Sequence, residues 1–220
     1  MTTPRLIPVW WTACVLTVLA VATLGFALLG TFSDGPQRWA GWLSSLASGL
    51  VLVAAAVAFA APRRRRALQP GPDGSVTIDS PSVIAGALVA AWATLLVVAG
   101  LWVAVAVTDL DRIESPGFTL VMVLAAAASL PDLGRLLTGR LHRWRLVLGP
   151  DGLSYRGYRT EVVLPWSKVH GARVQHRGPA GVLIDRKGTA PDPVVPITAF
   201  LLPADQIVEE IEQRLAVRRR

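Results

Sequence analysis

The chain divides into a long stretch of apolar runs and a shorter stretch in which apolar and polar residues alternate. Three runs, 7–30, 39–61 and 83–107, contain no charged residue. A helix rises about 1.5 Å per residue, so about 20 apolar residues cross a hydrocarbon core of about 30 Å. We therefore predict three transmembrane helices. The first run is also longer than the apolar region of a cleaved signal peptide, which has about 7–15 residues.

A fourth apolar run is interrupted. It begins at Phe118 and continues for 13 residues before Pro131 and Asp132. If it extends to Leu137 it reaches spanning length, and we predict a fourth transmembrane helix over about 118–137. Asp132 and Arg135 would then share a helix face, pair with each other and lie near the membrane surface.

The charged loops suggest one orientation. Arg63 to Arg66 form the densest basic cluster, and such clusters stay in the cytoplasm. Both termini are then cytoplasmic, and the turns at 31–38 and 108–117 lie outside. A fourth crossing returns four further arginines to the inside, whereas three crossings would leave the basic tail outside: Arg135, Arg140, Arg143 and Arg145. We expect a multi-pass protein of the cell inner (plasma) membrane.

Composition agrees with a membrane protein. The chain is 52% hydrophobic and 17% charged, whereas soluble domains carry about 25% charged residues. From Thr138 onward there are 14 Lys and Arg against 8 Asp and Glu, a net +6 of the total +7. The excess of arginine over lysine suggests a GC-rich bacterial genome. The single cysteine, Cys14, lies in the first apolar run and excludes an internal disulfide.

From about residue 139 the pattern predicts a small β-rich domain. Gly149 to Gly152 form a turn between the first two strands. A final helix follows Pro203, with acidic residues early, arginines late and an apolar stripe at Ile207, Ile211 and Leu215. The predicted fold is a four-span α-helical bundle over 1–138 and a β domain over 139–220, closed by an amphipathic helix. The predicted strands are 144–148, 153–156, 160–164, 172–176, 181–185 and 194–197.

Two short motifs carry a family resemblance. The turn Gly149-Pro150-Asp151-Gly152-Leu153 is followed by the run Pro165-Trp166-Ser167-Lys168-Val169, both ahead of the terminal helix. Residues 141–218 resemble the bacterial PH-like domains in this order of elements. The resemblance implies a binding platform for lipids or proteins. Members that bind inositol phosphates place basic residues between their first two strands. We take that loop as 149–152, which has an acid and no base, so such recognition is not expected.

The loop between the second and third apolar runs contains the same four-residue turn sequence. Gly71 to Gly74 repeat the sequence of residues 149–152. Two interpretations stay open, a shrunken duplicate of a helix-and-strand unit or coincidence in a loop rich in Gly and Pro. The β-forming residues Val76 to Ile78 are expected to form a short strand near the β domain.

The chain contains no nucleophile motif, phosphate-binding loop, dinucleotide fingerprint or metal-ligand spacing. The three histidines, His142, His170 and His176, have no cysteine or carboxylate pattern beside them that would complete a zinc site. We therefore expect no enzymatic activity and no cofactor. The first three apolar runs also lack ionisable residues, which transporters usually hold near the bilayer centre.

The sequence thus predicts a non-enzymatic membrane protein whose cytoplasmic domain docks a protein partner or the inner membrane surface. The alternative is a small transporter or channel accessory subunit. Arginines beside the membrane gain about 1 kcal/mol each from anionic lipid headgroups, although they can also serve only to fix topology. These are Arg63, Arg64, Arg65, Arg66, Arg140, Arg143 and Arg145.

Two residues of the resemblance are candidates for facing a partner, Trp166 and Lys168. Trp166 is also interpreted more simply as a packing residue. Nucleic acid is not expected as a ligand, because the domain is tethered and its basic residues are interspersed with acids. Small residues in the second apolar run (Ser45, Ser48 and Gly49) suit close helix packing, and a homo-oligomer stays open.

Overall fold

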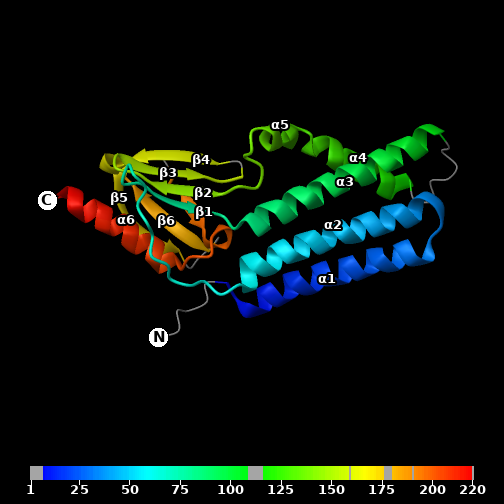
Figure 1. Ribbon diagram of the computed structural model, residues 1–220, viewed down its shortest axis with the longest axis horizontal. Coiled ribbons are helices and arrows are strands. Elements are labelled where there is room, and N and C mark those ends of the chain that lie inside the picture. The colour runs from blue at the N-terminus through cyan, green and yellow to red at the C-terminus, as the bar shows by residue number, and fades with distance from the viewer. Residues whose placement is uncertain (1–6, 109–115, 159, 176–179, 190, 220) are drawn as a thin grey trace. The chain divides into compact units, whose positions relative to one another are not determined.

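The computed structural model describes residues 7–108, 116–158, 160–175, 180–189 and 191–219 (Figure 1). The chain forms two compact units. The helical unit comprises residues 10–57 and 83–141, and the β-rich unit includes 58–82 together with 142–220. The β-rich unit therefore contains a segment that the sequence-based division at 138/139 assigned to the helices.

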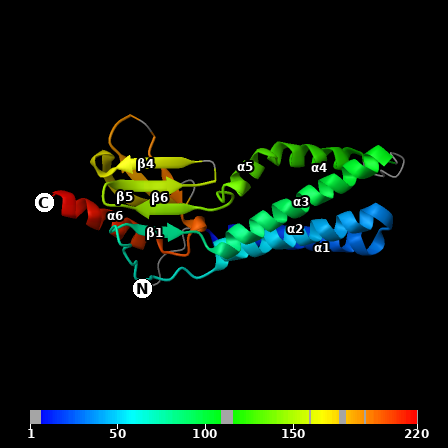
Figure 2. The same cartoon turned by 45° about the horizontal axis from the view of Figure 1, so that its top comes forward.

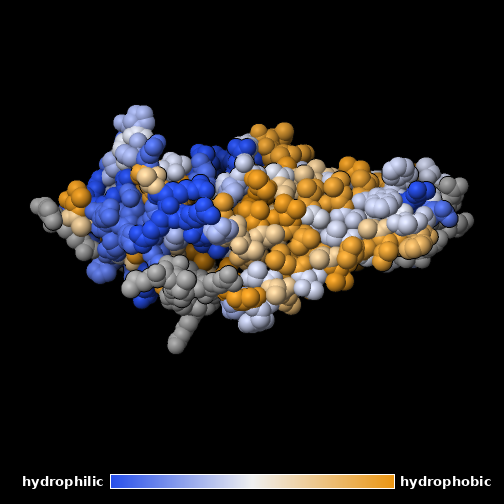
Figure 3. Space-filling view, turned by 60° about the horizontal axis from the view of Figure 1, so that its bottom comes forward, coloured by the Kyte–Doolittle hydropathy of each residue, from blue (hydrophilic) through white to orange (hydrophobic). Residues whose placement is uncertain are grey.

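Three helices of the helical unit confirm the prediction that each uncharged run forms a long apolar helix. They are α1 (Val9–Phe32), α2 (Gly35–Ala60) and α3 (Ser82–Thr108), and each is long and apolar enough to cross a membrane. Only 6%, 22% and 28% of the residues in their most apolar stretches are buried, and Figure 3 shows hydrophobic residues over much of the visible face of this unit. An apolar helical surface of this extent is typical of contact with lipid.

The fourth predicted segment is bent. It forms α4 (Pro116–Ser129) and α5 (Pro131–Leu137), and their axes differ by 47°. Pro131 explains the break, because proline has no N–H to donate and its ring clashes with the preceding turn. The described helices therefore include three candidate spans, or four if the bent pair is one span. Asp132 and Arg135 pair as predicted, and Asp132 is buried at 5% exposure.

Close packing of α1 and α2 depends on two glycines. A Cβ atom on Gly41 would lie 2.5 Å from the backbone nitrogen of Gly30, and one on Gly30 would lie 2.8 Å from that of Trp42. Nearby, the Ser45 hydroxyl donates to the Thr23 carbonyl oxygen at 2.9 Å. The two backbones approach because neither glycine has a side chain. Of the small residues named from the sequence, Ser45 and Gly49 lie against Thr23 of α1.

The β-rich unit contains two antiparallel sheets and a terminal helix. The first sheet has the order β1 (Val76–Asp79), β2 (Arg145–Leu148), β3 (Gly152–Arg156) and β4 (Glu161–Pro165). The second has the order β5 (Val169–Gln175), β6 (Gly181–Arg186) and β7 (Val194–Pro196). Helix α6 (Ala204–Arg219) completes the unit. This confirms the predicted β-rich region with a terminal helix.

The short strand expected at 76–78 is β1, the edge strand of the first sheet (Figure 2). It pairs with β2 so that Val76 lies opposite Leu148 and Ile78 opposite Leu146. The helices α3, α4 and α5 therefore lie in sequence between two adjacent strands. The loop at 149–152 joins β2 to β3, so it connects the second and third strands of this sheet rather than the first two, as was expected.

A single arginine of α6 contacts both Gly-Pro-Asp-Gly turns. Arg214 donates to the Gly74 carbonyl oxygen at 3.2 Å and to the Gly149 carbonyl oxygen at 3.4 Å. These turns lie just before β1 and just after β2, which are paired strands. The two turns with the same sequence are therefore neighbours in space. Whether they arose by duplication or by coincidence stays open.

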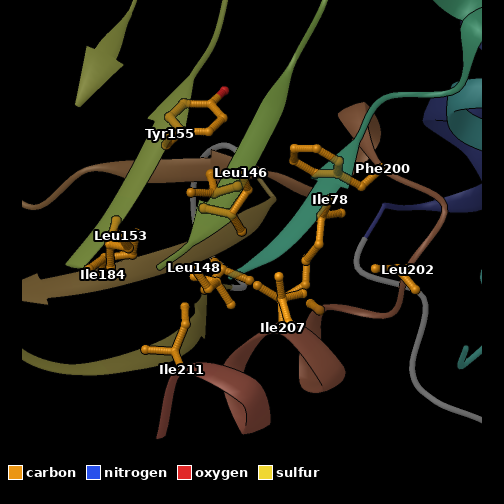
Figure 4. Close-up of a cluster of buried hydrophobic side chains, with 14 of the residues drawn as sticks. Ile78, Leu146, Leu148, Leu153, Tyr155, Ile184, Phe200, Leu202, Ile207 and Ile211 are labelled. Carbon is orange, nitrogen blue, oxygen red and sulfur yellow. The ribbon is translucent and has the colours of Figure 1, made fainter. Parts of the chain in front are cut away.

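The core of the β-rich unit lies between the sheets and α6 (Figure 4). Leu146 and Leu148 of β2 and Ile184 of β6 are fully buried. From α6, Ile207 and Ile211 complete the cluster, as the predicted apolar stripe requires. Burial of each such side chain contributes about 1.5–3 kcal/mol.

Tyr155 gives this core a measurable pH dependence. Burial raises the pKa of its phenol to about 12, whereas an unfolded tyrosine ionises near pH 10. Below pH about 10 the phenol is neutral in both states, but above it only the unfolded chain loses the proton. We expect stability to fall as the pH rises from about 10 to about 12, because over this range only the unfolded chain ionises at this residue. Thermal unfolding of Tyr155→Phe should lack this decline, and an identical decline in the variant would contradict the assignment.

Candidate functional site

The predicted basic cluster lies on the linker between α2 and β1 (residues 61–75), which is held against α6. The Arg65 guanidinium donates to both carboxylate oxygens of Glu209, at 2.9 and 2.7 Å. The Gln206 amide accepts from the Arg66 backbone nitrogen at 3.2 Å and donates to the Arg66 carbonyl oxygen. These contacts attach a segment that follows a candidate span to the terminal helix of the chain.

The Arg65–Glu209 pair is exposed, with about half of each side chain accessible to solvent. The hydrogen bonds and charge of Arg65 lower the pKa of Glu209, and Glu209 raises the pKa of Arg65. Exposed pairs contribute little to stability because water screens them. This pair therefore orients the linker more than it stabilises the fold.

Arg63 and Arg145 have structural partners. Arg63 donates to the Ala58 carbonyl oxygen at 2.9 Å, at the end of α2, and its partial burial lowers its pKa. Arg145 pairs with Asp79 at 2.5 Å across β1 and β2. On the neighbouring strands, Arg156 pairs with Glu161 at 3.4 Å. A row of charges thus crosses the first sheet at one end, with each arginine beside an acid.

The remaining predicted arginines are more available. The side chains of Arg64, Arg66 and Arg143 are exposed in the β-rich unit, and none forms an ion pair with a carboxylate that the structure describes. Arg140 is also exposed and belongs to the helical unit. Three of the seven candidate arginines thus form side-chain contacts within the protein (63, 65 and 145). The other four have exposed side chains that a ligand could reach (64, 66, 140 and 143).

The two candidate partner-facing residues differ. Trp166 is buried at 4% exposure, and its indole donates to the Gly149 carbonyl oxygen at 3.0 Å. Its packing interpretation therefore fits, and a role in facing a partner does not. Lys168, two residues later, is exposed. The indole hydrogen bond ties the short turn Trp166–Lys168 to the loop between β2 and β3.

An aromatic group was missed by sequence reasoning. The rings of His142 and Tyr158 stack with centroids 5.0 Å apart and planes 2° apart, and Trp144 lies 6.1 Å from His142. The contact joins the residues before β2 to those after β3. Local patterns do not reveal such contacts between strands. The sequence contained one indication of this group, namely that several aromatic residues follow the last apolar run.

The described part of the chain contains no group of three or more His, Cys, Asp or Glu side chains that could hold a metal ion. Cys14 lies exposed on α1.

Comparison with known proteins adds no family. No family model matches the chain, and neither a curated protein nor a solved structure matches it. The resemblance to bacterial PH-like domains is therefore a proposal supported by this chain's own residues.

Proposed function

We propose that this chain is a four-span integral membrane protein with both termini in the cytoplasm, whose PH-like domain docks onto the inner leaflet. The single observation that carries the proposal is the pairing of β1 with β2. This pairing constrains the path of the chain, because β1 precedes α3 and β2 follows α5, so all three helices between them connect two paired strands.

Paired strands must lie on the same side of a membrane. Adjacent strands are about 4.7–4.9 Å apart, whereas a hydrocarbon core is about 30 Å thick. The backbone of Ser80 also donates to the Trp144 carbonyl oxygen at 2.8 Å, immediately beyond the paired residues. If α3 crosses the membrane, the chain has to cross back before β2. This supports the bent pair α4 and α5 as the fourth crossing.

The linker contacts support the orientation. Arg65 and Arg66 contact α6, so the densest basic cluster and the terminal helix share one side of the membrane. Basic clusters stay cytoplasmic. The charge pattern and the contacts therefore favour the same topology, with the bacterial inner membrane as its location.

The PH-like assignment is supported by the order of elements. Two small antiparallel sheets follow each other along the chain and α6 closes the unit. On this proposal the first strand lies between the second and third spans, and the hairpin from α3 to α5 is inserted after it. A domain attached to the helices at both β1 and β2 is held at the membrane surface.

Docking onto the inner leaflet is supported by exposed arginines without carboxylate partners among the described residues. Arg64 and Arg66 follow α2 by a few residues, and Arg143 follows α5. Each gains about 1 kcal/mol beside an anionic leaflet. Docking to a protein partner is the other form of the same proposal, and native-membrane co-purification would identify that partner.

The test is charge removal in the full chain. We expect Arg64→Gln, Arg66→Gln and Arg143→Gln together to cost about 3 kcal/mol, a loss of about 100-fold in retention of anionic phosphatidylglycerol. Native mass spectrometry of protein released from mixed-lipid nanodiscs measures the retained lipid.

The matched control removes three arginines that have acidic partners: Arg156→Gln, Arg173→Gln and Arg218→Gln, paired with Glu161, Asp185 and Asp151. This control should retain the lipid. Equal retention by both triple variants would contradict docking through the exposed arginines.

One observation favours the alternative, a transporter or channel accessory role. Asp132 is a buried carboxylate within the helical unit, and ionisable residues inside membrane bundles often mark ion pathways. Its pairing with Arg135 gives it a structural explanation as well. If the bundle is the working part, Asp132→Asn should change ion flux in reconstituted vesicles while the arginine variants do not.

A further inference from the structure

One end of the first sheet carries aromatic side chains in a fixed arrangement. His142 and Trp144 precede β2, Tyr158 follows β3, and the rings of His142 and Tyr158 are stacked. His142 has a backbone φ of +53°, in the left-handed region that non-glycine residues rarely adopt. The His142 ring stacks on Tyr158 with centroids 5.0 Å apart, so the two rings form one contact between the segments that flank β2 and β3.

The same end of the sheet is where the chain joins the apolar helices. Asp79, the last residue of β1, lies opposite Arg145, which lies opposite Arg156 at the end of β3. Only two residues separate Asp79 from the start of α3. Helix α5 ends at Leu137, shortly before His142. The chain segments that connect the sheet to α3 and α5 therefore both leave from the end of the sheet that carries the aromatic group.

The residue types at this junction suit the boundary between lipid and water. Trp and Tyr have an apolar ring and a polar group, and they concentrate at the headgroup level of membranes. Arg143, exposed between His142 and Trp144, has an apolar stem and a charged end that reaches water or phosphate. The opposite end of the same hairpin differs, because it presents Asp151, which is fully exposed and pairs with Arg218 at 3.8 Å.

We propose that the end of the sheet formed by His142, Arg143, Trp144 and Tyr158 lies within the lipid headgroup layer. This junction surface is an aromatic anchor that sets the orientation of the β domain on the membrane. The proposal rests on the four-span function above, and it specifies which surface of the domain contacts lipid.

The test places one label at each end of the same hairpin in the full-length protein. In a Cys14→Ser background, Thr160→Cys lies just before β4 at the junction end, and Asp151→Cys lies just before β3 at the opposite end. Both positions are exposed. Each variant carries an environment-sensitive fluorophore, and the protein is reconstituted in phosphatidylcholine vesicles with and without brominated acyl chains.

We expect brominated lipid to quench the label at position 160 and to leave the label at position 151 unquenched. Uncharged phosphatidylcholine removes the attraction of arginines to an anionic leaflet, so quenching at position 160 in these vesicles does not depend on that attraction. Equal quenching at the two positions, or none at 160, would overturn the anchor. If 160 is unquenched while the arginine triple variant still loses anionic lipid, the anchor fails and the docking proposal stands. The reverse result supports the anchor and contradicts docking through arginines.

Discussion

A fragment of residues 141–220 should fail to fold, although it contains the whole β domain that the sequence pattern predicts. The fragment lacks β1, whose Val76 and Ile78 are 3% and 4% exposed in the intact chain. Each buried side chain contributes about 1.5–3 kcal/mol, and each lost hydrogen bond adds about 0.5–1.5 kcal/mol. Whole domains are stable by only about 5–15 kcal/mol.

Restoring the strand should restore the fold. Residues 62–80 joined through a short glycine-rich turn to 144–220 replace α3 to α5, and the Ser80–Trp144 hydrogen bond shows that their ends are adjacent. We expect this fusion to unfold cooperatively on heating, as followed by circular dichroism, whereas residues 141–220 alone aggregate or show no transition.

A matched pair of substitutions controls for composition in the fusion. Ile78→Asp places a carboxylate in the core and should abolish the transition. Thr77→Asp introduces the same group on the exposed face of β1 and should leave the transition nearly unchanged. If the fragment without β1 were as stable as the fusion, β1 would not be part of the domain.

The helices and the position of the β-rich region could be predicted because their signals are local. An uncharged run of more than 20 residues indicates a spanning helix wherever it occurs. The final helix was equally readable, since Ile207, Ile211 and Leu215 define one face and charge order complements the helix dipole. The bend at Pro131 was not predicted, because the fourth apolar run was interpreted as one helix over 118–137, whereas the structure divides it into α4 and α5.

The membership of β1 in the first sheet could not be predicted with certainty, because it depends on a distant partner. Asp79 and Arg145 are 66 positions apart in the sequence and form an ion pair. A four-residue strand contains no information about which strand it pairs with. For the same reason the His142–Tyr158 stack was missed. The simpler interpretation of Trp166 as a packing residue agrees with its burial in the core.

The second large effect concerns the side of the membrane on which two segments lie. Because β1 pairs with β2, residues before α3 and residues after α5 must be exposed to the same compartment. Cysteines placed in either of these segments should therefore react alike with a membrane-impermeant thiol reagent added to intact cells. The Cys14→Ser background removes the native thiol, and Ala67→Cys and Lys187→Cys are exposed positions in the β-rich unit.

Accessibility of these cysteines to a membrane-impermeant thiol reagent in intact cells tests the account most directly, with Asp34→Cys, in the turn between α1 and α2, as the opposite-side reference. The four-span topology predicts labelling at position 34, and protection at 67 and 187 until the membrane is permeabilised. Labelling of 67 and 187 from opposite sides would contradict the β1–β2 pairing in the membrane, and with it the four-span topology and the split β domain.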